Sequence, residues 1–258
     1  MDLYNKNNEE AKSLTILNNL INWNTDAPDI WNLLGNTHFD VKDYSKAVKA
    51  YQKAIDIDST YAKGFTNLGF SLMKTGAYNE ASNAFKKATR FNPFKNNLES
   101  FSVALVTEGR NKNRAGNNEE ALTIFEQAFN LSVNYDTATA LAELLYFNEN
   151  SVKAFETIKS VDINEISKTR KIKFLELACK VAIDINLEQE SKAYYESLKA
   201  INPSPNYILE ALINNASGNN ETAKELLSKA NPLMLKEQFL SKKFNATAIN
   251  IIKQIQND

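Results

Sequence analysis

The chain carries few of the side chains from which enzymes build active sites. Among its 258 residues, His38 is the one histidine and Cys179 the one cysteine. A zinc site of the usual kind needs four nitrogen or sulfur ligands, so this inventory does not supply one. Both residues fall at helix-packing positions of the hydrophobic pattern, where a structural histidine and a buried, unreactive thiol are the simpler interpretation. The sequence therefore predicts no catalytic residue, no metal site and no cofactor.

Other groups with chemical potential have structural explanations. The acidic pairs Glu9–Glu10 and Glu119–Glu120 stand where helices are predicted to begin, and negative charge at that end stabilises the helix dipole. Gly109 and Gly116 lack the spacing of a phosphate-binding loop. We therefore expect a protein that is not an enzyme.

The charge balance argues against several classes of partner. The net charge is −1 with 24% charged residues, whereas proteins that bind nucleic acid by neutralising phosphates normally carry a basic excess. One local basic cluster (Arg110, Lys112, Arg114) keeps RNA binding open as an alternative. The longest apolar runs, such as Val103–Val106, are far shorter than the roughly 20 residues that span a bilayer.

The start of the chain and its cysteine content bear on the compartment. Residues 1–25 are polar, with no basic segment followed by an apolar one, so no signal peptide is predicted. A single cysteine allows no internal disulfide, which fits a reducing compartment. We expect a cytoplasmic protein, although a periplasmic or otherwise exported protein that has lost its leader would share these features.

The elements that position these residues follow from an internal repeat. Residues 28–61 and 62–95 carry the same pattern with an offset of 34. The matching pairs are Trp31 and Phe65, Leu34 and Leu68, Gly35 and Gly69, Tyr44 and Tyr78, Ala47 and Ala81, Tyr51 and Phe85, and Ala54 and Ala88. In each block the first three lie on one face of a helix and the others on a second helix. Self-similarity at this period predicts stacked helix–turn–helix units.

Later units are more divergent. Gly116, Ala121, Phe125 and Ala128 repeat Gly76, Ala81, Phe85 and Ala88 with an offset of 40, so the third unit has six additional residues. We expect these residues to lengthen its first helix, over roughly residues 96–114. The predicted units are 28–61, 62–95, 96–135, 136–168, 169–204 and 205–237, with a capping helix within 1–27 and another within 238–258. No stretch rich in Pro, Gly or Ser divides the array 28–237.

The order of a bulky aromatic residue, Leu-Gly, Tyr, Ala, aromatic and Ala resembles the tetratricopeptide repeat (TPR) family. Residues 28–95 match this pattern nearly completely, the third unit matches in its second helix, and later units match weakly. The resemblance implies an all-α fold, a right-handed superhelical solenoid of about six repeats with flanking capping helices. It also implies that the first helices line a concave groove that binds a peptide or helix of another protein. A scaffold or adaptor is the expected function.

Carried over residue by residue, the groove positions of the family fall on polar, aromatic and basic side chains. They are Asn32, Asn36, Phe39, Lys63, Phe70, Met73, Lys74, Arg110, Arg114 and Tyr146. Aromatic and Met side chains beside Lys and Arg predict a partner segment that is both apolar and acidic. The alternative is that Phe39, Phe70 and Tyr146 pack between helices, because a shift of one position exchanges groove for core.

Two further interpretations concern the kind of partner. Co-chaperones of the family clamp a carboxylate with two Asn and several basic residues. Asn36 and Asn67 occupy the Asn positions, but Asn32 stands at the first basic position and the third repeat has no matching Lys/Arg pair. The charge assistance that makes such hydrogen bonds strong is therefore missing. Self-association through the amphipathic residues 233–258 is the remaining alternative.

Overall fold

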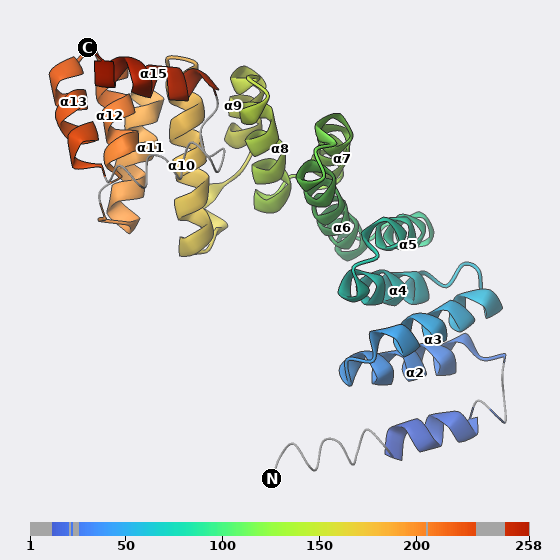
Figure 1. The fold of residues 1–258 in the computed structure, drawn as a ribbon. Helices are drawn as coiled ribbons and strands as arrows, with labels where there is room; N and C mark the ends of the chain where they lie inside the picture. Colours follow the sequence, from blue (N-terminus) through green and yellow to red (C-terminus); the bar gives the residue numbers. More distant parts are fainter. Residues whose placement is uncertain (1–11, 21, 23–25, 205, 231–245, 258) are drawn as a thin grey trace, which may run out of the picture. The chain divides into compact units, whose positions relative to one another are not determined.

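The computed structural model describes residues 12–20, 22, 26–204, 206–230 and 246–257, and it is built from helices joined by short connections (Figure 1). Within these residues there is no β-strand, and the helices pack in pairs, so the all-α prediction is confirmed. The chain divides into two compact units, Met1–Ser132 and Val133–Asp258. The composition of the sequence did not predict this division, because no flexible segment marks it.

The first unit contains successive helix pairs after a leading helix at residues 12–20. The pairs are α2 (Pro28–Asp40) with α3 (Tyr44–Ile57), α4 (Ala62–Thr75) with α5 (Tyr78–Phe91), and α6 (Lys95–Arg114) with α7 (Asn118–Leu131). With its 20 residues, α6 confirms that the additional residues of the third unit lengthen its first helix.

A contact between a glycine and an aromatic ring recurs inside each pair. A Cβ atom added to Gly35 would lie 2.4 Å from the ring of Tyr51, one on Gly69 would lie 2.7 Å from Phe85, and one on Gly109 would lie 2.5 Å from Phe125. Only a glycine allows the two helices of a pair to approach this closely. Gly109 thus corresponds to Gly35 and Gly69, which places the additional residues in the first turns of α6. The 34-residue spacing of the first two repeats alone does not reveal this equivalence, because Gly109 follows Gly69 by 40 residues.

The turn inside each pair needs a left-handed backbone conformation. Gly76 and Gly116 supply it with φ angles of 83° and 85°, which glycine adopts without steric cost. At the same place in the first pair stands Lys42, with a φ of 63°. The first pair therefore bears a backbone strain that the next two avoid.

The core of the first unit combines the small and aromatic residues of the repeat pattern. Ala47, Tyr51, Ile55, Phe65, Leu68, Ala84 and Ala88 form one buried cluster. Because it joins α3 to α4 and α5, each pair stabilises the next. A smaller cluster places Leu17 of the leading helix against Leu34 and Ala50, as expected for a helix that covers the first repeat.

The second unit has the same kind of pairing. It contains α8 (Tyr135–Phe147), α9 (Ser151–Lys159), a 3-10 turn (Ile163–Glu165), α10 (Lys168–Asp184), α11 (Glu188–Ile201), α12 (Tyr207–Ala216), α13 (Asn220–Lys229) and α15 (Ala246–Asn257). Leu175, Cys179, Leu198, Leu209, Leu212 and Ile252 belong to one buried cluster.

The closing segment is described only in part, because residues 231–245 lie outside the described residues. In the described part, α15 packs against α12 and α13, and Ile252 is fully buried in the cluster of its own chain. The described apolar residues Ile249, Ile251 and Ile252 of α15 therefore pack against the last helix pair.

Candidate functional site

The first helices of the three pairs in the first unit lie next to one another, since α4 contacts both α2 and α6. Residues at equal positions of the repeat therefore form rows across these helices. One row consists of Asn36, Phe70 and Arg110, and another of Asp40, Lys74 and Arg114. We call the surface formed by α2, α4 and α6 around these rows the first-helix wall.

A cavity of about 420 Å³ opens in the first-helix wall between α2 and α4. It is lined by Asn36, Phe39, Asp40, Tyr51, Asn67 and Phe70. The structure thus brings three of the predicted contact residues, Asn36, Phe39 and Phe70, into one depression. A concave site with apolar walls and a few polar groups is the usual form of a ligand site in proteins.

Phe70 supplies the largest apolar surface of this cavity. Its side chain is 43% exposed, whereas Phe65 and Leu68 of the same helix are buried in the core. The Phe70 ring lies edge-on to the ring of Phe85, with 5.0 Å between the centroids, and this contact restricts its orientation. Phe39 is half-buried and packs in the same manner on Tyr44, at 5.2 Å. Phe70 is therefore accessible and already oriented.

Three asparagines and a tyrosine form a hydrogen-bonded network at the base of the cavity. The Asn67 side-chain amide donates to Asn32 at 2.8 Å and to Asn36 at 3.2 Å, and the Tyr51 hydroxyl donates to Asn36 at 2.8 Å. Asn32 is only 3% exposed. The expectation that Asn32 faces a partner is therefore wrong, because its side chain is buried and holds Asn67 in place.

Burial keeps Tyr51, the one titratable side chain of this network, in its protonated form. Desolvation raises the pKa of the Tyr51 hydroxyl far above its usual value, and the nearby Asp40 carboxylate raises this pKa further. Tyr51 therefore remains protonated, and a hydrogen-bond donor to Asn36, at neutral and moderately alkaline pH.

The charged residues of the first-helix wall are unevenly distributed. Lys63 and Lys74 on α4 and Arg110 and Arg114 on α6 are all exposed, whereas Met73 is half-buried. By contrast, α2 contributes the acidic Asp40. The wall therefore carries basic residues on α4 and α6 and an acidic residue on α2.

Lys112, the third member of the basic cluster in the sequence, is engaged within the chain. Its ammonium group lies 2.8 Å from a carboxylate oxygen of Glu120. This hydrogen bond raises the pKa of Lys112. Arg110 and Arg114 are then the cations that α6 presents on the wall.

Tyr146 does not lie on an exposed surface. Its side chain is 0% exposed and its ring lies 5.5 Å from that of Phe147. The small residues Ala138 and Ala142 of α8 are also fully buried, since they allow neighbouring helices to come close. The prediction that Tyr146 faces a partner is therefore wrong, and packing between helices, the alternative interpretation, holds for it.

Two exposed apolar residues of the wall were not among the predicted contact residues. Leu33 on α2 is 52% exposed and Val103 on α6 is 47% exposed. Leu33 stands at the same position of the repeat as Asn67. When Gly109 is aligned with Gly69, Val103 stands at the same position as Lys63. The glycine–aromatic spacing was the signal that could have found Val103.

The two residues with catalytic potential are placed as the sequence analysis expected. Cys179 is fully buried, and burial raises the pKa of its thiol well above the usual value, so the reactive thiolate is suppressed. His38 is half-buried on α2, and burial lowers the pKa of its imidazole. Both observations favour structural roles.

Comparison with known proteins decides the family. A sequence model of the tetratricopeptide repeat matches residues 28–61, and a second model of this repeat matches residues 62–95. The chain is a TPR repeat-containing protein. TPR proteins generally mediate protein–protein interactions, and their repeats are typically non-catalytic scaffolds.

Curated relatives contain similar TPR segments within much longer chains. Mouse DnaJ homolog subfamily C member 7 is 31% identical over 140 residues, which are 54% of this chain and 26% of the relative. Anaphase-promoting complex subunit 3 of Schizosaccharomyces pombe is 24% identical over 165 residues, which are 61% of this chain and 23% of the relative. The chain thus spans about a quarter of the length of these relatives.

Solved structures support the helical-repeat fold. The C-terminal part of a TPR repeat-containing protein from Cytophaga hutchinsonii has a TM-score of 0.56 at 18% identity, with 97% of both chains covered. YrrB, described as a TPR protein with an unusual peptide-binding site, has a TM-score of 0.52 at 16% identity, with 78% of this chain and 97% of YrrB covered. In the described part of the TPR chain, no helix has both the length and the apolar composition to cross a bilayer.

Proposed function

We propose that the first unit is a non-enzymatic binding module that holds a short peptide or helix of a partner protein against the first-helix wall. The observation that carries this proposal is the cavity of about 420 Å³ that contains the exposed ring of Phe70. An aromatic side chain that is both accessible and fixed in orientation is typical of the residues that dominate binding energy at protein interfaces.

The side chains of the wall indicate the chemistry of the partner segment. An apolar residue of the partner would enter between Phe39 and Phe70, where the cavity is most apolar. An acidic residue would lie toward Arg110 and Arg114, which are exposed on α6. The charges would determine orientation and association rate more than affinity.

The details of the wall do not favour a clamp for a terminal carboxylate. In the register set by Gly109, the positions of α6 that would need basic residues are Val103 and Thr107. Asn32, at the first basic position, is buried. A carboxylate would therefore meet amides without the positive charges that make such bonds strong.

RNA binding is also less well supported than protein binding. The basic cluster of α6 is reduced to Arg110 and Arg114, because Lys112 pairs with Glu120. Two exposed cations offer little of the phosphate neutralisation from which nucleic-acid affinity arises.

The test is capture of partners by the purified chain, with bound proteins identified by mass spectrometry. The wild type is compared with Phe70→Asp/Arg110→Glu, which reverses the apolar and basic character of the wall. The matched control is Phe94→Asp/Lys86→Glu, which makes the same chemical changes at exposed residues that do not line the cavity. Circular dichroism verifies that all three proteins are folded.

We expect a partner that the wild type and the control retain and the wall variant loses, because only the wall variant places a carboxylate at the apolar centre of the cavity. Equal capture by all three proteins would contradict the proposal and would mean that the binding site lies outside the first-helix wall. Equal loss in both variants would indicate non-specific charge attraction.

A further inference from the structure

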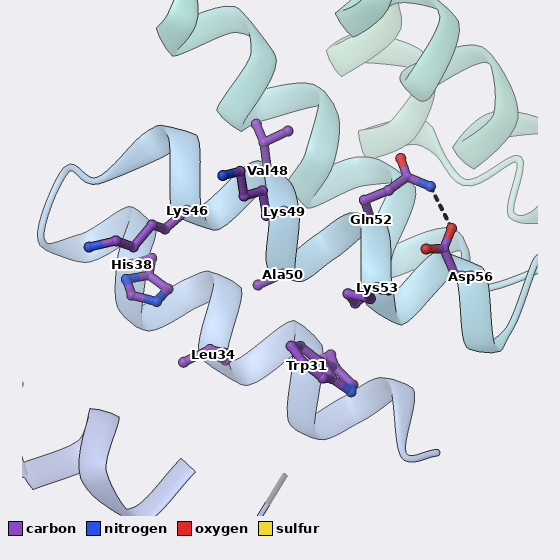
Figure 2. A pocket seen from close by; sticks show the side chains of 10 residues that line it. All are labelled: Trp31, Leu34, His38, Lys46, Val48, Lys49, Ala50, Gln52, Lys53 and Asp56. Atoms are coloured by element: carbon purple, nitrogen blue, oxygen red, sulfur yellow. Dashed lines mark hydrogen bonds between the residues drawn. The ribbon is translucent and has the colours of Figure 1, made fainter. Parts of the chain in front are cut away.

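A second cavity, of about 560 Å³, is lined by side chains of α2 and α3 (Figure 2). Trp31 and Leu34 of α2 and Ala50 of α3 form its apolar floor, and Lys46, Lys49 and Lys53 of α3 stand at its edge. None of these six residues lines the cavity of the first-helix wall. We call this depression the α2–α3 cavity.

The internal repeat explains why this face is incompletely covered. In the second repeat, Phe65 and Leu68 occupy the positions of Trp31 and Leu34. Phe65 is only 5% exposed, because α3 of the preceding repeat packs over this face. The first repeat has no preceding repeat in the described chain, and Trp31 remains only partly buried.

The leading helix covers this face only in part. Leu17 packs against Leu34 and Ala50, yet the cavity remains open beside this contact. Ile16 and Leu20 of the same helix are exposed. This end of the first unit therefore exposes apolar side chains outside the cavity as well, more than one isolated hydrophobic residue.

The edge of the α2–α3 cavity is basic. Lys46, Lys49 and Lys53 follow one another at i, i+3 and i+7 on α3, so they form a stripe about 10 Å long on one side of the helix. The ammonium group of Lys46 lies 2.8 Å from Asp43. No ion pair involving Lys49 or Lys53 occurs among the described residues. The acidic residue of this edge, Asp56, accepts a hydrogen bond from Gln52 at 2.9 Å.

We propose that the α2–α3 cavity is a second docking site, which binds an amphipathic helix of a partner protein whose apolar stripe is flanked by acidic residues. A helix fits because helices cover the equivalent face in the second repeat. The cavity volume lies in the range of about 300–1,000 Å³ that is usual for ligand sites, enough for several apolar side chains. The lysine stripe selects acidic residues that recur at i, i+3 and i+7, the same periodicity as its own.

The proposal is tested with a defined probe. The probe is a fluorescent, alanine-based helical peptide with leucines on one face and glutamates at i, i+3 and i+7 along the edge of that face. A control peptide has lysines in place of these glutamates. Fluorescence anisotropy measures binding to the wild type, to Lys49→Glu/Lys53→Glu, and to Lys74→Glu/Arg110→Glu, which makes the same change of charge on the first-helix wall.

We expect Lys49→Glu/Lys53→Glu to bind the glutamate peptide about tenfold more weakly than the wild type, and Lys74→Glu/Arg110→Glu to lose clearly less. The lysine peptide should show the opposite preference, with tighter binding to Lys49→Glu/Lys53→Glu than to the wild type. Both affected residues are exposed, so the substitutions leave the fold intact.

Three results would overturn the proposal. The first is no binding of the glutamate peptide to the wild type. The second is a loss of affinity in Lys74→Glu/Arg110→Glu that equals or exceeds the loss in Lys49→Glu/Lys53→Glu, which would mean non-specific attraction or binding in the first-helix wall. The third is a wild type that is dimeric by light scattering and becomes monomeric in Lys49→Glu/Lys53→Glu, which would place a second copy of the chain in the cavity.

Discussion

The contact between Gly69 and Phe85 is the sharpest test of how the helix pairs are held together. A Cβ atom on Gly69 would lie 2.7–2.8 Å from three atoms of the Phe85 ring. The ring cannot move aside, because it is 1% exposed and lies against Phe70. Overpacking of a rigid core typically costs about 1–3 kcal/mol, and these contacts place Gly69→Ala near the upper end.

A second contribution has the opposite sign. Alanine is more favourable than glycine inside a helix by about 1 kcal/mol. The expected net effect of Gly69→Ala is a loss of about 2 kcal/mol in the free energy of unfolding of the first unit. Urea unfolding followed by tryptophan fluorescence measures this quantity selectively, because Trp23 and Trp31 both belong to the first unit.

A double-mutant cycle separates the steric contact from other effects. Phe85→Leu removes ring atoms that the new methyl group would meet, so Gly69→Ala/Phe85→Leu should lose about 1–2 kcal/mol less than the sum of the single losses. Gly76→Ala is the matched control, since a Cβ atom there meets nothing within 4 Å. Its effect should add to that of Phe85→Leu. A Gly69→Ala protein that is more stable than the wild type, or full additivity with Phe85→Leu, would refute the reasoning.

Two further predictions concern the first helix pair. Lys42→Gly should stabilise the first unit by about 0.5–1 kcal/mol in urea unfolding. It relieves a left-handed conformation that costs a non-glycine residue about 1–2 kcal/mol, and the greater entropy that glycine gives the unfolded chain offsets part of this gain. An unchanged midpoint would show that the loop relaxes. Because burial lowers the pKa of His38 in the folded state, the unfolded state binds more protons as the pH falls below about 6.5, and stability should decrease there. The decrease should be smaller in His38→Gln, and identical pH profiles would contradict this assignment.

The repeat pattern and its consequences could be predicted from the sequence because they depend on local spacing. Gly35 and Gly69 recur with an offset of 34 beside aromatic residues on the following helix, and this predicted the pairs α2–α3 and α4–α5. The six residues inserted in the third unit kept a helical pattern, so the long helix α6 was also predictable. The burial of Cys179 followed from its place on an apolar face.

The exposure of individual wall residues could not be predicted in the same way. Asn32 and Asn36 are both polar and lie one turn apart on α2, and Asn67 of the next repeat donates a hydrogen bond to each, yet only Asn32 is buried. Tyr146 has the residue type of a contact residue, but the surroundings of α8 enclose it. The exposure of such residues depends on which side chains of neighbouring helices pack against them.

The sequence by itself determined the secondary structure, the pairing of helices and the family, because a period of 34 residues encodes which faces must be covered. Only the tertiary structure decided which parts of those faces remain open. The cavity beside Phe70 and the α2–α3 cavity both arise where the side chains of packed helices leave space unfilled. The volume left between packed helices depends on the side chains of all neighbours together, and no periodicity within a single helix contains that information.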